Sequence, residues 1–281
     1  MTFLAAMDPQ SGLLDEVEPG AYGSALAHIY AANAPFPHIV IDDFLPDQIA
    51  RLFLAEFDFD DAAGGAQGRT FDRAQERAKK QISPENLSPQ VRQIFYAFNS
   101  RPFLQVLEDI TGITGLIPDP DFLGGGLHEI APGGHLSVHA DFNRHKRLNL
   151  ERRINLLIYL NEGWQDAFGG QLEFWSPDMT LCEKSVVPVF NRAVIFNTTS
   201  TSYHGNPNPV AHPDGISRKS IALYYYTATW DASMRSHTTR FRARPRTADK
   251  ADWGVATKEL AKDLIPPIIS RNLGKLKRQA D

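Results

Sequence analysis

The sequence predicts an α+β fold, in which a helical N-terminal half precedes an antiparallel β-sandwich or barrel. Two observations carry this prediction. Apolar residues before Pro118 recur with helical spacing, whereas after Pro118 short strand-like segments follow one another, separated by Gly, Pro and Asn. Helices followed by strands are typical of this class, and the sequence contains neither an internal repeat nor a Gly-rich phosphate loop.

Length and composition fit one globular domain over residues 1–281. With 281 residues, 42% of them hydrophobic, the chain can bury a substantial core without splitting in two. We expect the core at about 36–230. A leader and short helix at 1–34 precede it, and a C-terminal extension at 231–281 follows it.

Start and stop signals define the helices. Ser24 can cap an Ala-rich stretch that Pro35 terminates, and Ser88 can cap a later helix. Pro46 and Pro102 each stand where a helix can open. The expected helices are 25–32, 47–57, 89–100, 102–111 and 256–264.

Between the second and third helices, residues 58–81 are rich in Asp, Ala, Gly, Arg and Lys and include Gly64-Gly65. This composition indicates a surface loop. A solvated connector is favoured there over a lid.

Strand signals occur once before Pro118 and repeatedly after it. The apolar run 36–45 suits a buried strand. The later segments are short and end at turn residues, which favours antiparallel pairing. They are 125–130, 135–142, 153–160, 171–175, 182–189, 193–197 and 217–229.

Charge and cysteine content exclude several classes of protein. A formal net charge of −4 gives no general attraction to nucleic acid. Cys182 is the only cysteine, so neither an intrachain disulfide nor a Cys-based zinc cluster can form. Without a signal-peptide pattern or a membrane-length apolar run, we expect a soluble cytoplasmic protein without a membrane partner. The oligomeric state stays open.

The central motif is His139-Ala140-Asp141. On a strand, side chains at i and i+2 point to the same face, so an imidazole and a carboxylate would converge there. This pair can begin a 2-His-1-carboxylate iron(II) site. A second match, His212-Pro213-Asp214, lies in a turn and cannot place its two side chains on one strand face.

The remaining groups of such a site occur downstream. His204 follows the strand 193–197 and a turn, and Gly205 after it allows close approach of the backbone. Arg218 and Ser220 share one face of a later strand, where they can hold a carboxylate through a guanidinium and a hydroxyl. Lys219 would point to the opposite face.

Taken together, these motifs resemble the iron(II)- and 2-oxoglutarate-dependent dioxygenases of the prolyl-4-hydroxylase-like group. The resemblance covers roughly residues 36–229 and implies a double-stranded β-helix with flanking helices. The motifs that carry it, in chain order, are His139-Ala-Asp141, Arg153-Ile-Asn-Leu-Leu-Ile-Tyr-Leu-Asn161, Gly169-Gly170-Gln171-Leu172, Tyr203-His204-Gly205 and Ser217-Arg218-Lys219-Ser220.

The resemblance also implies roles for individual residues. The iron ligands and catalytic residues fall on His139, Asp141 and His204. The basic residue that pairs with the distal carboxylate of 2-oxoglutarate falls on Arg218, assisted by Ser220. Two further cosubstrate contacts fall on one strand face, at Tyr159 and Asn155.

The implied activity is hydroxylation of an unactivated C–H bond, coupled to decarboxylation of 2-oxoglutarate to succinate. The cofactors would be Fe(II), 2-oxoglutarate and O2, with ascorbate as an accessory reductant. The carboxylate of Asp141 favours hydroxylation, because related halogenases have a small residue at that position. The substrate can be a small molecule or a peptide, and the sequence does not identify it.

Two other classes of protein remain open. A metal-binding cupin-like protein without oxygenase activity would keep the histidines but would not need Arg218. A jelly-roll carbohydrate-binding module would need neither. Of the remaining histidines, two are expected in the pocket wall or in structural roles, one lies in the first helix, and four are assigned to surface or turn positions: His128 and His135; His28; His38, His145, His212 and His237.

Overall fold

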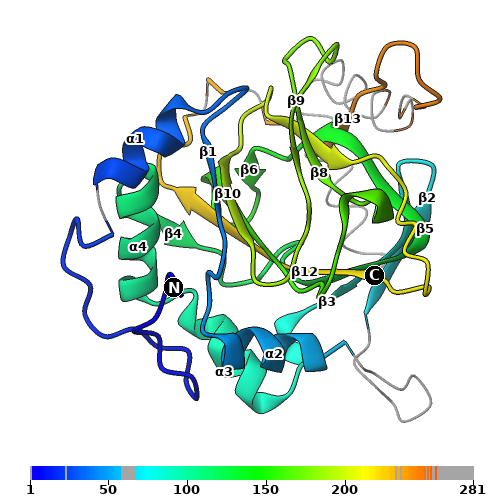
Figure 1. Cartoon of the computed structure of the whole chain (residues 1–281). Coiled ribbons are helices and arrows are strands. Elements are labelled where there is room, and N and C mark those ends of the chain that lie inside the picture. Colours follow the sequence, from blue (N-terminus) through cyan, green and yellow to red (C-terminus); the bar gives the residue numbers. More distant parts are fainter. Residues whose placement is uncertain are drawn as a thin grey trace, which may run out of the picture.

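Within the described part of the chain, thirteen strands form one curled sheet, with the helices outside it (Figure 1). Every strand pair in the part of the chain that is described is antiparallel. The architecture comes from a computed structural model, which describes residues 2–22, 24–57, 68–231, 233–234, 236–250, 252, 254 and 257. The predicted α+β class and double-stranded β-helix are confirmed.

Eight strands follow one another across the main path of the sheet. Most of them lie within a few residues of a segment expected from the sequence. In spatial order they are β1 (His38–Ile41), β10 (Ala193–Asn197), β7 (Leu150–Tyr159), β12 (Arg218–Thr227), β5 (Gly126–Ala140), β11 (Tyr203–Asn206), β8 (Leu172–Trp175) and β9 (Cys182–Val186).

The longest strand, β5, belongs to both layers of the barrel. The first layer continues from it through β12, β7, β10 and β1, and the second layer continues through β11, β8 and β9. The first half of β5 pairs with β12, where Ile130 lies opposite Arg218. Its second half pairs with β11, where His139 lies opposite His204. Two predicted segments, 125–130 and 135–142, are therefore one strand that passes from the first layer to the second.

The expectation of a solvated connector at 58–81 is wrong for its second part. Residues Arg69–Arg73 and Glu76–Ile82 form a hairpin, β2 and β3, and β3 pairs with β5. Most side chains of β3 are polar and only partly buried, so the strand lacks the apolar alternation that identifies strands in a sequence. Residues 58–67 lie outside the described part of the chain.

Three two-residue strands complete the sheet: β4 (Ile117–Pro118), β6 (Arg144–His145) and β13 (Arg240–Phe241). β6 pairs with β7, and β13 pairs with the end of β5 beside His139. The C-terminal extension therefore reaches the edge of the barrel that carries the central motif.

Four α-helices pack against the outer face of the first layer: α1 (Ser24–Ala32), α2 (Asp47–Ala55), α3 (Pro89–Ala97) and α4 (Arg101–Thr111). Ser88 caps α3 as predicted, because its hydroxyl accepts the Val91 N–H at 3.4 Å. Short 3₁₀ turns span Pro84–Asn86 and Asp166–Phe168. Most of the predicted helix 256–264 lies outside the described residues.

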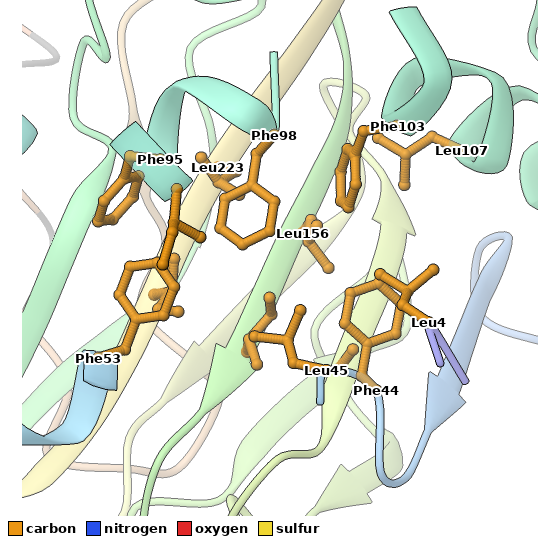
Figure 2. Close-up of a cluster of buried hydrophobic side chains, with 14 of the residues drawn as sticks. Leu4, Phe44, Leu45, Phe53, Phe95, Phe98, Phe103, Leu107, Leu156 and Leu223 are labelled. Atoms are coloured by element: carbon orange, nitrogen blue, oxygen red, sulfur yellow. The ribbon is translucent and has the colours of Figure 1, made fainter. Parts of the chain in front are cut away.

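The main hydrophobic core lies between these helices and the sheet. Figure 2 shows Phe53, Phe95 and Phe98 from the helical side facing Leu156 and Leu223 of the strands. All five are fully or almost fully buried. This core fixes the outer face of β7 and β12, so their inner face is left for the polar residues of the site.

Residues expected in the leader contribute to the same core. Leu4 and Met7 are buried, and Leu4 packs beside Phe44 (Figure 2). No helix in the described ranges has the length and apolar character required to cross a bilayer.

Candidate active site

The side chains of His139, Asp141 and His204 converge at the end of β5. His139 lies opposite His204 in the β5–β11 pair, and Asp141 follows β5 directly. Nε2 of His139 lies 3.6 Å from Asp141 Oδ1, and Nε2 of His204 lies 3.4 Å from Asp141 Oδ2. One ligand atom from each residue lies within 4.8 Å of the other two. The structure thus brings the three predicted ligands together.

Hydrogen bonds determine which ring nitrogen of His139 and of His204 faces Asp141. Nδ1 of His139 lies 2.9 Å from the carbonyl oxygen of Ser137, and Nδ1 of His204 lies 2.9 Å from that of Ser202. A carbonyl oxygen can only accept, so each Nδ1 carries the proton and donates. Each Nε2 therefore directs a lone pair toward Asp141, which is the tautomer that a metal ion requires.

The carboxylate has the charge that this donor set needs. Burial alone would raise the pKa of Asp141, but the Arg152 guanidinium holds that pKa well below its ordinary value. Burial lowers the pKa of His139. A carboxylate and neutral imidazoles are the states in which these side chains bind a metal ion, so the residues fit iron(II).

Gly205 lets the two central strands approach each other, as predicted. A Cβ at this position would lie 2.8 Å from the Leu136 carbonyl oxygen and 2.9 Å from that of Ser137. Real Cβ atoms do not come this close to backbone oxygens, so a side chain here would push β11 away from β5. The close approach also places His204 beside His139.

Arg152 is a further residue of the site, and it was not predicted from the sequence. Its side chain is 1% exposed, and Nη2 lies 3.2 Å from Asp141 Oδ2. Nη2 and Nε donate to Asn155 Oδ1 at 2.7 and 3.1 Å, and Asn155 Nδ2 donates to Asp141 Oδ2 at 2.8 Å. The Tyr224 ring lies 3.7 Å from the guanidinium carbon. Asn155 thus contacts both Arg152 and Asp141, and these contacts hold the Asp141 carboxylate in place.

A β-bulge explains why Arg152 was missed. Strict alternation along β7 would place Arg153, rather than Arg152, on the face of Asn155. The register between β7 and β12 shifts at this point, because Tyr225 pairs with Ile154 while Tyr226 pairs with Arg152. The shift turns Arg152 inward, and a sequence pattern carries no clear sign of it.

Arg218 lies at one end of the β5–β12 pairing, opposite Ile130 of β5. It is 4% exposed, Nε donates to the Gly170 carbonyl oxygen at 2.7 Å, and its guanidinium carbon lies 4.8 Å from the centre of the Tyr159 ring. Burial lowers the pKa of Arg218. Within the described residues no carboxylate pairs with it, and the buried Tyr159 hydroxyl has no hydrogen-bond partner. A buried guanidinium beside an unpaired hydroxyl fits the distal carboxylate of 2-oxoglutarate.

One glycine and one strand register support this second group. A Cβ at Gly170 would lie 2.9 Å from Cδ of Arg218, so only glycine leaves room for the arginine. Ser220 is 2% exposed and lies opposite Tyr159 across the β7–β12 pair. Lys219 is only half-buried and bonds to Ser217 instead, as the alternation predicted.

A cavity of about 1000 Å³ connects the metal-binding group with Arg218. Its wall includes the three ligands and several of the polar residues already described, namely Arg152, Asn155, Arg218 and Ser220. His128 also lines it, as expected, and donates from Nε2 to the Gly124 carbonyl oxygen at 3.0 Å. Tyr159 lies behind the wall, in the core of the barrel.

A second group, Asp119, Asp121 and His145, has a similar composition. Here, however, Nδ1 of His145 accepts the Leu148 N–H at 3.2 Å, so the proton of the neutral ring is on Nε2. That nitrogen faces Asp119 Oδ1 at 3.5 Å and Asp121 Oδ2 at 3.8 Å. A protonated nitrogen has no lone pair for a metal ion, so the geometry favours a structural role for this group.

Three histidines expected at surface or turn positions are buried instead. His38, His145 and His237 are 3%, 1% and 4% exposed. Each ring has hydrogen-bond or aromatic contacts that offset its burial: His38 Nδ1 with the Phe36 carbonyl oxygen, His145 with the Tyr226 ring, and His237 Nε2 with the Ser200 hydroxyl. His212 does lie in a turn, as expected, against Phe168.

Comparison with known proteins supports the same chemistry. Residues 125–226 match the family model of the 2OG-Fe(II) oxygenase superfamily. This stretch contains all three predicted ligands and Arg218. The match confirms the resemblance to iron(II)- and 2-oxoglutarate-dependent oxygenases, and the chain is an enzyme of that type, with iron, 2-oxoglutarate and O2 as cofactors. Curated protein sequences give no match.

Several solved structures are similar in fold. HygX from Streptomyces hygroscopicus, with nickel, 2-oxoglutarate and hygromycin B bound, has 12% identity and a TM-score of 0.52, covering 83% of this chain and 99% of its own. A Pseudomonas putida prolyl-4-hydroxylase has 24% identity and a TM-score of 0.47, covering 72% and 98%. A Trichoplax adhaerens prolyl hydroxylase in complex with a hypoxia inducible factor peptide fragment has 17% identity and a TM-score of 0.49, covering 75% and 93%.

Proposed function

We propose that this enzyme hydroxylates an unactivated C–H bond of its substrate while it decarboxylates 2-oxoglutarate to succinate. In this reaction one atom of O2 enters succinate and the other enters the new hydroxyl group. The observation that carries the proposal is the pair of Nε2 lone pairs directed at Asp141, in a cavity that also contains Arg218.

His139, Asp141 and His204 are the proposed iron ligands. Bound iron(II) would supply the activation of O2 and leave coordination positions open for the cosubstrate. The carbonyl oxygens of Ser137 and Ser202 hold both imidazoles in the ligating tautomer. Asp141 supplies the negative charge, and the presence of this carboxylate favours hydroxylation over halogenation.

Arg218 is the proposed partner of the distal carboxylate of 2-oxoglutarate. Ser220 lines the cavity with Arg218 and is placed to donate a hydrogen bond to the same group, while Tyr159 lies beside Ser220 on the neighbouring strand. Burial strengthens these contacts because water does not screen them. The other end of the cosubstrate would then extend through the cavity toward the ligands.

Arg152 and Asn155 act on Asp141 as positioning residues. Asn155 donates to one carboxylate oxygen, Oδ2, and the Arg152 guanidinium lies beside the same atom. The other oxygen, Oδ1, is then free to face the metal ion. We expect this arrangement to keep Asp141 charged and correctly rotated before iron binds.

Substrate-uncoupled turnover of 2-oxoglutarate tests the proposal. We expect the purified enzyme with iron(II) to form succinate, and the Asp141→Ala variant to form it at least ~100-fold more slowly, because a ligand is lost. Succinate would be quantified by mass spectrometry, with circular dichroism as a check that the variant folds. Full turnover in a folded Asp141→Ala protein would refute the assignment.

The alternatives make different predictions in the same assay. A metal-binding cupin-like protein would bind iron(II) without forming succinate. Loss of the buried Arg218 guanidinium would not change its iron(II) binding. A carbohydrate-binding module would show neither property. An Arg218→Gln variant that binds iron(II) normally but needs a higher concentration of 2-oxoglutarate supports the oxygenase.

A further inference from the structure

The charge of the cavity differs from that of the whole chain. The protein has a formal net charge of −4, yet cationic side chains outnumber carboxylates among the described residues that line the cavity. One iron(II) ion and one 2-oxoglutarate dianion would cancel each other in charge. Loading with the proposed cofactors therefore leaves the excess of positive charge in place.

Every carboxylate in the cavity wall already has a cationic partner. Glu76 lies 2.7 Å from Arg73 and 3.2 Å from Lys79. Asp121 lies 2.9 Å from Arg147. The third carboxylate, Asp141, has the Arg152 contact and the proposed metal ion. No lining carboxylate in the described ranges is thus left to bind a cationic substrate.

Besides Arg218, three cationic side chains at the cavity have no such partner among the described residues. Arg69 of β2 lies over the Phe71 ring at 4.7 Å. Arg144 of β6 donates to Asn149 Oδ1 and lies over the Trp230 ring at 5.2 Å. Lys146, in the turn after β6, is exposed and lines the same cavity. No carboxylate pairs with any of the three among the residues with described positions.

We propose that the substrate is a small molecule with a negatively charged group, a carboxylate or a phosphate, that is bound by Arg69, Arg144 and Lys146. This inference rests on the proposed oxygenase function and names its substrate class. Cations that line a concave site attract anions and raise their local concentration. Arginine in particular binds both groups through two parallel hydrogen bonds.

The rest of the cavity wall defines the body of this substrate. Phe71, Phe142 and Phe241 line the cavity together with the cations, so an apolar or aromatic skeleton would pack against them. A cavity of about 1000 Å³ lies at the upper end of the range for small-molecule sites, roughly 300–1,000 Å³. It can hold the cosubstrate and a compact second molecule together.

Matched probes test this substrate class directly. The full chain would be loaded with zinc(II) and saturating 2-oxoglutarate, so that no turnover occurs and Arg218 is occupied. Isothermal titration calorimetry would then compare 1-naphthyl phosphate with 1-naphthol, and 1-naphthoate with 1-naphthamide. We expect at least one anion to bind about 10-fold more tightly than its neutral partner, and this preference to shrink between about 0.05 and 0.5 M salt.

Variants assign the preference to the named residues. Arg144→Gln with Lys146→Gln should reduce the preference to less than about 3-fold, and Arg69→Gln should reduce it by a smaller factor. The control, Arg92→Gln with Lys184→Gln, removes the same two types of charge from a half-buried and an exposed position outside the cavity wall and should leave the preference unchanged. Equal binding of anion and neutral probe, or a preference that survives in the double variant, overturns the inference.

Two further measurements distinguish an error in the substrate class from an error in the proposed function. Suppose that neither naphthyl anion binds more tightly than its neutral partner, but a tetra-aspartate peptide binds. This result would overturn the small-molecule class in favour of an acidic peptide. Uncoupled succinate formation is measured with iron(II) on the same wild-type protein. Its absence refutes the proposed function, whereas turnover without any anion preference refutes only the substrate class.

Discussion

The described residues include two largely buried clusters of histidine and aspartate, and the orientation of the histidine rings distinguishes them. In the cluster at Asp141, both Nδ1 atoms donate to backbone carbonyls and both Nε2 lone pairs face inward. In the cluster at Asp119, Nδ1 of His145 accepts a backbone N–H, so Nε2 faces the carboxylates without a free lone pair. Residue type and distance alone would not separate them, whereas one backbone contact per ring does.

The surrounding groups reinforce the difference. Asp119 accepts two backbone N–H groups, from Asp121 and Leu123, both at 2.9 Å. These hydrogen bonds to the Asp119 oxygens thus stabilise the turn that follows β4. Asp141 accepts instead from the side chain of Asn155, which leaves Oδ1 directed at the imidazole of His139. The first carboxylate stabilises a turn, and the second is available to a metal ion.

The largest expected effect comes from removing one histidine from each cluster and comparing metal binding by the two variants. His204→Ala should lower iron(II)-dependent succinate formation at least ~100-fold, because it removes a ligand, and should abolish stoichiometric binding of cobalt(II). His145→Ala should keep both properties and lose about 1–3 kcal/mol of unfolding free energy, because a buried polar contact is lost. Cobalt absorption spectra and chemical denaturation measure the two quantities.

The comparison would fail if His145→Ala also lost the metal ion while its fold was retained. A second metal site at Asp119 would then be required. Normal cobalt binding by His204→Ala would equally contradict the tautomer argument.

A smaller effect is expected from the residue that holds Asp141. Arg152→Met keeps the length of the side chain but removes its contact with Asp141, so metal affinity should fall about 10–100-fold. Arg153→Met is the matched control, because Arg153 is half-buried and contacts Thr227 at 3.4 Å. Metal titration in the absence of 2-oxoglutarate measures both. Equal affinities in the two variants would show that Arg152 does not position the carboxylate.

The smallest effect concerns a third type of buried histidine. Burial, with the Lys79 charge, lowers the pKa of His128 to about 3. The unfolded chain therefore binds a proton between about pH 6.5 and 3 that the folded chain does not, so His128 reduces stability as the pH falls through this range and has no effect above it. The slope is at most ~1.4 kcal/mol per pH unit. His128→Gln should flatten the stability profile below pH 6.5 in urea denaturation, and an unchanged profile would contradict the assignment.

The sequence predicted which strand faces carry most of the candidate site residues, because strand periodicity is regular around them. His139 and Asp141 are two residues apart, and Arg218 and Ser220 share one face of β12, as alternation requires. The same rule failed at Arg152, where a bulge changes the register of β7. It also failed at the β2–β3 hairpin, whose polar strand lines a cavity and so lacks an apolar face.

Histidine burial was the other failure, and its cause is different. The rings that pack against His38 and His145 belong to Phe174 and Tyr226, far along the chain. Such contacts exist only once the sheet has closed. The expected division into leader, core and extension stays a prediction.

The continuity of β5 through both layers has a consequence for engineering this enzyme. Ile130 and His139 lie on one strand, opposite Arg218 and His204, so a fixed length of extended backbone sets the spacing between the two binding ends of the cavity. A one-residue insertion or deletion in β5 would reverse the faces of everything beyond it. Libraries that alter substrate range should therefore diversify the hairpin and the β6 turn and leave this strand intact.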